Sequence, residues 1–430
     1  MVKKINIVTL GCSKNVYDSE LLLGGFKRNN FEITSDPVDA DYVIVNTCGF
    51  LDQAREESID VILDLERLRK TNKISQLVVA GCMSERFEDE MRDELDHVDH
   101  FFGTNDTNKI IDFICSKAHQ KFDPDFNRIN LTPKHYGYLK ISEGCDNGCS
   151  FCSIPLMRGL QKSQPIEWNV QEARRMSLNG TKEILVIAQD STSYGWDLRP
   201  RASLDKLLYS LNNIENVDWI RLHYAHPAHL KQKIINCFRD LEKMLPYIDM
   251  PIQHASNNIL SSMRRGLNID GIKRKIDQLK NVRSDIAIRT SLIVGFPNET
   301  DRDFDELYSF VRETEFDRLG VFMYSEEDGT VGHKNLEDNV PKEVKKSRLD
   351  EIMKLQHNIS IKNNSTLIGS TQKVIIDTIT HDGKSIGRTF RDSPEIDNTV
   401  TINSKLNVGS FYDVLIKDIS AYDIFGEVVN

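Results

Sequence analysis

Six apolar segments, separated by stretches with helical periodicity, occupy the middle of this sequence and constrain its fold more than any other feature. Continuous apolar runs between helical stretches are typical of parallel strands buried on both faces of a sheet. Six such β/α units in succession predict a sheet that curls into a partial (β/α)6 barrel. The segments cover residues 138–142, 183–190, 219–227, 247–254, 286–297 and 318–325.

Polar or unusual residues gather at the predicted C-terminal ends of these strands, where barrels of this kind carry their chemistry. Three clustered cysteines, Cys145, Cys149 and Cys152, follow the first segment. The active site is therefore expected at this end of the barrel. The other candidates are Gln189, Asp190, Ser191 and Thr192 after the second segment, His223 and His226 at the third, Gln253 and His254 after the fourth, and Gly295, Phe296 and Pro297 after the fifth.

A shorter series of apolar runs lies within residues 4–118, and each run ends at a cysteine: Cys12, Cys48 or Cys82. These runs also read as buried parallel strands, which predicts an open α/β domain. Because the carboxyl ends of parallel strands lie along one edge of such a sheet, we expect the three cysteines to converge. The alternative is that each cysteine is only a small buried hydrophobe. Three coincidences in three strands argue against that alternative.

The C-terminal part changes character again. Pro341 begins a long charged helical stretch, whose basic residues we expect on a solvated face. Residues 365–430 then read as short strands broken by turns, which predicts a small antiparallel β-barrel. We therefore predict three domains: an N-terminal open α/β domain over 1–120, the partial barrel over 131–362 and the β-barrel over 365–430.

Composition limits the partners and the compartment. The 55 basic and 65 acidic side chains give a net charge of −10, so a nucleic-acid partner would need a local basic patch. We expect a cytoplasmic protein without a membrane partner, because no segment offers eighteen uninterrupted apolar residues and MVKKINIVTLGCSKN lacks a signal-peptide cleavage pattern. Eight cysteines in a reducing compartment indicate metal binding or catalysis rather than disulfides.

Three kinds of site compete for the cysteines at 145, 149 and 152. A zinc site needs four ligands, usually in two pairs, and no second pair lies nearby. A disulfide is disfavoured by the compartment and would leave one thiol over. A 4Fe–4S cluster fits best, because thiolates are its standard ligands. Three thiolates for four irons would leave one iron with an open coordination position.

The spacing C-x3-C-x2-C, with Phe151 before the last cysteine, resembles the radical S-adenosylmethionine superfamily. The resemblance implies that Cys145, Cys149 and Cys152 are catalytic and hold a 4Fe–4S cluster whose open iron binds S-adenosylmethionine. It also implies cleavage of that cofactor to a 5′-deoxyadenosyl radical. By the same resemblance, Phe151 and the stretch with Gly295 and Phe296 contact the adenine, although a Gly-Pro turn ending a strand explains the latter equally well. Gln189, Asp190 and Ser191 are expected near the methionine end.

The segments LGCSKNVYDSE, VNTCGF and GCMSER resemble the methylthiotransferases within that superfamily. This implies a second 4Fe–4S cluster on Cys12, Cys48 and Cys82, a C-terminal TRAM barrel, and an electron donor that these motifs do not name. PIQHAS, MRRG and SPEID resemble the RimO type, which methylthiolates the β-carbon of an aspartate in ribosomal protein uS12. The alternatives are the related enzymes that modify adenosine-37 of transfer RNA and a non-enzymatic iron–sulfur RNA-binding protein.

Charge supports the protein substrate over RNA at this stage. Residues 365–430 hold nine acidic and six basic side chains, a balance of −3, and an RNA-gripping module should be basic. Cys115 and Cys237 fall at apolar helical positions and are predicted to be packed thiols. Arg158 could pair with a substrate carboxylate or with a structural acid, and both assignments stay open.

Overall fold

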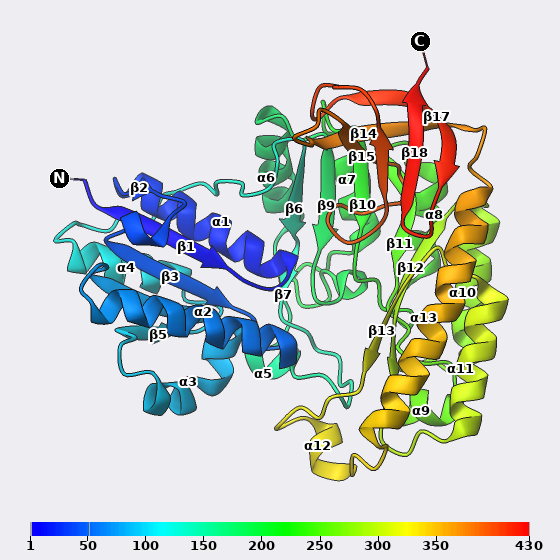
Figure 1. Cartoon of the computed structure of the whole chain (residues 1–430), viewed down its shortest axis with the longest axis horizontal. Helices are drawn as coiled ribbons and strands as arrows, with labels where there is room; N and C mark the ends of the chain where they lie inside the picture. The colour runs from blue at the N-terminus through cyan, green and yellow to red at the C-terminus, as the bar shows by residue number, and fades with distance from the viewer. Residues whose placement is uncertain (1, 51, 430) are drawn as a thin grey trace. The chain divides into compact units, whose positions relative to one another are not determined.

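The computed structural model describes residues 2–50 and 52–429, and the chain divides into two compact units (Figure 1). The first unit contains residues 1–132, 143–146 and 153–161, and the second contains 133–142, 147–152 and 162–430. None of the helices built from the described residues combines the length and apolar character needed to cross a bilayer.

The first unit is the predicted open α/β domain, and its parallel sheet has the strand order β2-β1-β3-β4-β5. One apolar cluster joins one face of the sheet to α1 and α4, and another joins the opposite face to α2 and α3. Its strands are β1 (Lys4–Thr9), β2 (Glu32–Ile33), β3 (Tyr42–Thr47), β4 (Gln76–Gly81) and β5 (His100–Phe102), and its helices are α1 (Ser13–Arg28), η1 (Pro37–Asp39), α2 (Asp52–Lys70), α3 (Cys82–Glu94), α4 (Thr107–Lys117) and α5 (Ile154–Arg158).

The second unit contains the predicted partial barrel, a six-stranded sheet with the order β13-β12-β11-β10-β9-β6 in which the neighbouring strands are parallel. The main apolar core lies between these strands and the helices that alternate with them. The strands are β6 (Tyr136–Lys140), β9 (Glu183–Ile187), β10 (Trp219–Leu222), β11 (Met244–Asp249), β12 (Ala287–Val294) and β13 (Arg318–Met323). The other elements are β7 (Ser142–Glu143), β8 (Lys162–Ser163), η2 (Ser191–Ser193), α6 (Ile166–Leu178), α7 (Leu204–Asn212), α8 (Gln232–Asp240), α9 (Asn257–Ser262), α10 (Ile269–Val282), α11 (Asp301–Thr314), α12 (Val331–Asn335) and α13 (Lys342–Ser365).

The C-terminal segment forms the predicted small barrel, which closes in the order β14-β15-β16-β18-β17. Four of its pairings are antiparallel, whereas β16 and β18 pair in parallel. Apolar side chains such as Val374, Val400 and Ile424 fill its interior. The strands are β14 (Thr371–Ile379), β15 (Ser385–Arg388), β16 (Thr399–Ile402), β17 (Phe411–Ile419) and β18 (Asp423–Val428).

The long helix α13 differs from its prediction in one respect. Lys345 and Arg348 were expected on a solvated face, but both are buried. The Lys345 ammonium lies 2.6 Å from a carboxylate oxygen of Asp338, and the Arg348 guanidinium lies 2.8 Å from one of Glu299. Each charge is therefore neutralised inside the protein, and α13 packs onto the barrel through ion pairs as well as apolar contacts.

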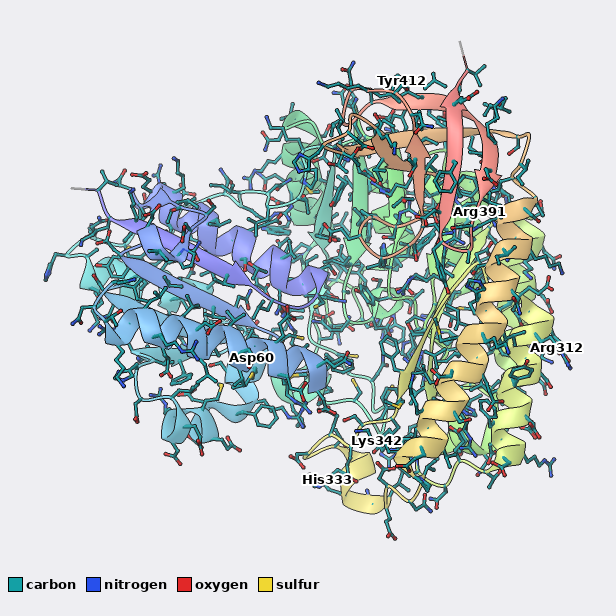
Figure 2. The ribbon with its side chains drawn as sticks, in the orientation of Figure 1. Asp60, Arg312, His333, Lys342, Arg391 and Tyr412 are labelled. Carbon is teal, nitrogen blue, oxygen red and sulfur yellow. The ribbon has the colours of Figure 1, made fainter. Side chains whose placement is uncertain are left out.

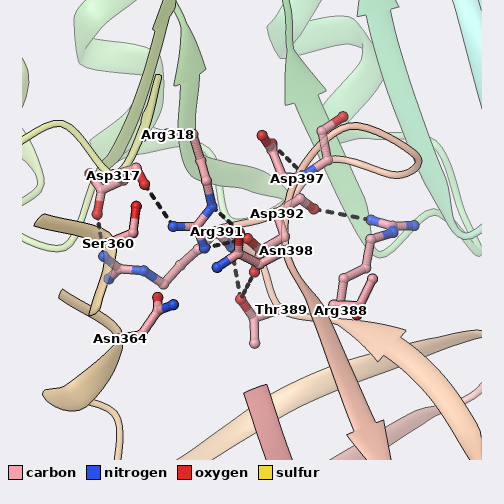
Figure 3. A network of polar contacts seen from close by, with 12 residues as sticks. Asp317, Arg318, Ser360, Asn364, Arg388, Thr389, Arg391, Asp392, Asp397 and Asn398 are labelled. Atoms are coloured by element: carbon pink, nitrogen blue, oxygen red, sulfur yellow. Dashed lines mark hydrogen bonds and ion pairs between the residues drawn. The ribbon is translucent and has the colours of Figure 1, made fainter. Parts of the chain in front are cut away.

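A loop of the C-terminal barrel, residues 389–398, is held to the partial barrel by buried ion pairs (Figure 3). The Arg318 Nε atom donates to Asp392 over 2.9 Å, and Arg289 lies 3.3 Å from Asp397. Figure 2 shows Arg391 of the same loop and Tyr412 on β17. The paired acids come from the SPEID stretch and its neighbour Asp392, so this segment joins the barrel to the core of the second unit.

Candidate active site

The three N-terminal cysteines stand where three strands of the first unit end. Cys12 directly precedes α1, Cys48 follows β3, and Cys82 begins α3 after β4. Gly11 has a φ of +91°, and a Cβ atom there would lie 2.7 Å from the Cβ of Cys48. A Cβ atom on Gly49 would lie 2.8 Å from the backbone of Cys82. The strand ends therefore meet at one sheet edge, which is the arrangement the sequence predicts.

Three cysteine thiols at one sheet edge are the kind of donor set that an iron–sulfur cluster uses. Within the residues that the structure describes, no three histidine, cysteine or carboxylate side chains are placed to hold one metal ion. Cluster thiolates bind different iron atoms, so they need not converge on one point. Ser84, two residues after Cys82, has a buried hydroxyl without a hydrogen-bond partner in the described structure. The role of Cys12, Cys48 and Cys82 as cluster ligands stays a prediction.

The second cysteine triad is divided between the two units. Cys145 belongs to the first unit, where its backbone N–H donates to the Gly159 carbonyl over 3.0 Å. Cys149 and Cys152 belong to the second unit, where the Cys152 N–H donates to the Cys149 carbonyl over 3.2 Å in a tight turn. Gly144 precedes the triad with a φ of +74°, and a Cβ atom there would lie 2.3 Å from the Leu160 carbonyl oxygen. The loop stem therefore leaves no room for a side chain.

The tip of the cysteine loop is fixed within the second unit by polar contacts. The Ser150 hydroxyl donates to the Ser262 carbonyl over 2.7 Å. The Asn147 amide donates to the Asp190 carboxylate over 2.9 Å, which ties the loop to the end of β9. Arg265, a buried residue that the sequence did not single out, donates to the Cys149 sulfur over 3.2 Å. The MRRG stretch contained the only signal for it, without indicating a role.

Asp190 organises the polar residues after β9. It is 2% exposed, and His229 lies 2.7 Å from its carboxylate, which also accepts from the Thr192 backbone over 2.9 Å. Burial alone would raise the pKa of Asp190, but the hydrogen bond from His229 and the neighbouring charges hold that pKa well below its usual range. Ser191 donates to the His223 carbonyl over 2.7 Å, so its hydroxyl is engaged inside the protein.

The two aromatic residues predicted near the adenine, Phe151 and Phe296, pack in one apolar cluster with Met263 and Tyr324. Phe296 is fully buried, and its backbone N–H and that of Gly295 donate to Glu299 over 3.2 and 2.8 Å. The structure thus brings the two predicted stretches together. Sequence analysis missed Glu299, which holds this turn from four residues beyond Gly295.

The histidines considered at the third strand have protein partners. The His223 Nε2 atom lies 3.1 Å from the Ser393 hydroxyl. The His226 Nδ1 atom accepts from the Ala228 N–H over 3.2 Å, and the His226 ring stacks on His229 with centroids 4.7 Å apart. Burial, reinforced by the Arg265 charge, lowers the pKa of His226 to about 3, so its ring is neutral near pH 7.

Cys115, Cys237 and Arg158, to which the sequence assigned no catalytic role, all lie in buried surroundings. Cys115 and Cys237 are fully buried in apolar clusters, which confirms the prediction of packed thiols. Arg158 pairs with two acids of its own unit, Asp18 and Glu143, and donates to the sulfur of Cys82. The structural assignment of Arg158 is therefore the one that the geometry favours.

Known families account for most of the chain. The Uncharacterized protein family UPF0004 matches residues 4–103, the Radical SAM superfamily matches 139–311, and the TRAM domain matches 368–429. Among solved structures, the radical S-adenosylmethionine methyltransferase TsrM from Kitasatospora setae has a TM-score of 0.57 at 11% identity, over 74% of this chain and 73% of that one. The cobalamin-dependent S-adenosylmethionine radical enzyme OxsB has a TM-score of 0.53 at 11% identity, over 82% and 56%. These likenesses show the fold alone.

Full-length relatives carry a common name, ribosomal protein uS12 methylthiotransferase RimO. The protein of that name from Christiangramia forsetii is 43% identical over 99% of this chain and 94% of its own length. That from Bacteroides fragilis is 42% identical over 99% of both chains. That from Acetivibrio thermocellus is 41% identical over 100% of this chain and 99% of its own. The similarity therefore extends through both cysteine triads and the C-terminal barrel.

Proposed function

The chain belongs to the RimO family of ribosomal protein uS12 methylthiotransferases, and on that premise we propose that it adds a methylthio group to the β-carbon of an aspartate in uS12 by radical S-adenosylmethionine chemistry. It is a radical S-adenosylmethionine enzyme with a TRAM domain. Because the proposed substrate is a ribosomal protein, we expect the enzyme to act in the cytoplasm.

The presence of two separate cysteine triads carries this proposal. Replacing a C–H bond with a methylthio group needs hydrogen abstraction, a sulfur source and a methyl donor. A radical enzyme without sulfur transfer would not require three further cysteines as a matched set at one sheet edge. Those cysteines, Cys12, Cys48 and Cys82, meet at the edge where β1, β3 and β4 end.

We assign the cofactors to the two triads. Cys145, Cys149 and Cys152 would hold the 4Fe–4S cluster that, with S-adenosylmethionine, supplies the hydrogen-abstracting radical. Cys12, Cys48 and Cys82 would hold the second 4Fe–4S cluster.

The protein's own residues would orient the cofactors and exclude water. Asn147 and Asp190 fix the loop tip, and the cluster of Phe151 and Phe296 offers an apolar surface for the adenine. Gln189 and Ser191 stand beside Asp190 at the end of β9, where the methionine part is expected. We propose the same three domains as the sequence predicts: residues 1–120 for the second cluster, 131–362 for the radical chemistry, and 365–430 for the TRAM barrel.

The charge of the C-terminal barrel does not select the substrate as the sequence count suggested. Asp377, Asp392, Glu395 and Asp397 hydrogen-bond or pair inside the second unit, as do Arg388 and Arg391. The exposed charges are six acidic, Glu395 among them, and four basic, so the barrel surface is only weakly acidic. The choice of uS12 over transfer RNA therefore rests on family membership.

Mass spectrometry tests the substrate. In cells lacking the gene, uS12 should lose a methylthio-sized mass and transfer RNA should keep its own modification, and the wild-type gene should restore the uS12 mass. Loss from the transfer RNA alone would overturn the proposal.

Iron analysis tests the cofactors independently. After anaerobic reconstitution the chain should hold about eight irons, four for each cluster. About four irons would contradict the second cluster.

A further inference from the structure

Arg158 is a buried cation set among the predicted ligands of the N-terminal cluster. It ends α5, six residues after Cys152, and its side chain is 2% exposed. Its Nε atom donates to the Cys82 sulfur over 3.2 Å. Its two Nη atoms reach Asn15 over 2.6 Å, Asp18 over 2.8 Å and Glu143 over 3.1 Å. All these residues belong to the first unit, so the arrangement is internal to it.

The Asn15 side chain is held in an orientation that lets it accept a hydrogen bond from Arg158. Its amide nitrogen donates to the carbonyls of Leu10 and Thr47 over 2.7 and 2.9 Å, next to Cys12 and Cys48. The amide oxygen is therefore turned toward Arg158 and accepts from it. The guanidinium of Arg158 thus bonds both to the sulfur of Cys82 and to Asn15, which holds the backbone near Cys12 and Cys48.

Arg158 also joins the cluster edge to the stem of the radical cysteine loop. Glu143 precedes Cys145 by two residues and Arg158 follows Cys152 by six, and their side chains pair across the stem. Burial alone would lower the pKa of Arg158, but Asp18 and Glu143 raise it well above its usual value, so the guanidinium stays charged.

We propose that Arg158 is a positioning residue of the N-terminal cluster: it holds Cys82 by a charge-assisted hydrogen bond and stabilises the reduced cluster with a buried positive charge. This inference rests on the proposed function, because it needs a cluster on Cys12, Cys48 and Cys82. Hydrogen bonds to ligand sulfurs and net charge are known controls of cluster potential. Asp18, also paired with Arg158, would act in the opposite direction.

The test uses the full chain with Cys145, Cys149 and Cys152 replaced by alanine, so that only the N-terminal cluster remains. Iron content and a redox titration followed by electron paramagnetic resonance are measured, not turnover. Arg158→Gln should shift the midpoint potential downward, because a positive charge is lost. Arg158→Lys should recover part of the shift, and Asp18→Asn should move the potential upward. Arg28→Gln is the matched control. This exposed arginine lies at the far end of α1, about 24 Å from Cys12, so its loss should leave the potential unchanged.

The outcomes separate the inference from its premise. If the parent with three alanines holds no iron, the second cluster and with it the proposed function are wrong. If that parent holds about four irons but Arg158→Gln and Asp18→Asn leave its potential unchanged, Arg158 is only structural and the inference is overturned. If Arg158→Gln binds too little iron to titrate, Asp18→Asn decides, since only a charge effect predicts an upward shift there.

Discussion

His226 is a buried residue whose neutral form the fold requires. Its Nδ1 atom accepts a backbone hydrogen bond, and its pKa falls from 6.5 to about 3, chiefly through burial and then through the Arg265 charge. Between those two values the unfolded chain binds a proton that the folded chain does not, so acid favours unfolding in this window.

We predict that the free energy of unfolding falls between pH 6.5 and about 3, with His226 contributing a slope of at most about 1.4 kcal/mol per pH unit. The contribution is complete above pH 6.5, because both states are then neutral. Urea unfolding followed by tryptophan fluorescence measures it, since Trp168, Trp196 and Trp219 all lie in the second unit. His226→Asn should flatten the slope, and the exposed His381→Asn should not. An equal slope in His226→Asn and the parent would refute the prediction.

Gly144 makes a second prediction at the scale of one residue. Its φ of +74° disfavours any side chain, and a Cβ atom would lie 2.3 Å from the Leu160 carbonyl oxygen. Gly144→Ala should distort the stem of the cysteine loop and lower iron content from about eight to about four per chain, because the radical cluster is lost. Gly148→Ala, inside the same loop with no atom within 4 Å of the added Cβ, should keep about eight. Full iron in Gly144→Ala would show that the stem tolerates a side chain.

Sequence predicted the cysteines at this scale but not the charged residues beside them. Cys12, Cys48, Cys82 and Cys145 each follow an apolar run, so local pattern alone places them after a strand. Arg265 and Glu299 acquire their roles from partners that the fold brings close: Arg265 contacts Cys149, 116 positions away, and Glu299 pairs with Arg348, 49 positions away. A charged residue that is buried looks the same in sequence as one that is solvated.

At the scale of elements, the loop over residues 389–398 holds the C-terminal barrel to the partial barrel within the second unit. Asp392 is fully buried and neutralises Arg318 at the start of β13, and its other oxygen accepts from Thr389 over 2.9 Å. Removing one partner of a buried pair leaves an uncompensated charge.

Asp392→Asn should therefore destabilise the second unit by up to about 3–5 kcal/mol, because Arg318 would stay buried without its paired carboxylate and keep only the charges of Asp397 and Asp317 near it. The midpoint of urea unfolding, followed by tryptophan fluorescence, should fall accordingly. Asp382→Asn is the control: this carboxylate lies on the surface beside Lys384, where water screens the pair, so its loss should leave the midpoint almost unchanged. Equal midpoints for the two variants would mean that the loop does not hold the barrel through this charge.

Long apolar elements were predictable and short or buried polar ones were not. Strands β2 and β5 have two and three residues, too few for a hydrophobic period to appear. The buried face of α13 carries Lys345 and Arg348, which a hydropathy pattern assigns to solvent. The parallel pairing of β16 with β18 depends on how the barrel closes, which no local pattern encodes.

At the scale of the whole molecule, the predicted domains are contiguous, whereas the two compact units interleave. Residues 143–146 and 153–161 belong to the first unit although they flank the tip of the cysteine loop in the second. Gly144 and Cys145 contact Leu160 and Gly159 across the stem, and Arg158 bonds to Asn15, Asp18 and Cys82 of the first unit. A boundary read from composition cannot anticipate a chain that crosses between units within one motif.

The net charge of −10 on the whole chain predicts that binding of uS12 depends on salt. A ribosomal protein that binds RNA phosphate is basic, so an acidic enzyme should attract it over distances comparable with the Debye length, about 10 Å at 0.1 M salt. Raising salt from about 50 to about 200 mM should therefore raise KM for uS12 several-fold and change kcat little, because screening weakens encounter rather than chemistry. The control is cleavage of S-adenosylmethionine without uS12, which should be insensitive to the same salt. A KM that stays constant would mean that short-range contacts alone recruit the substrate.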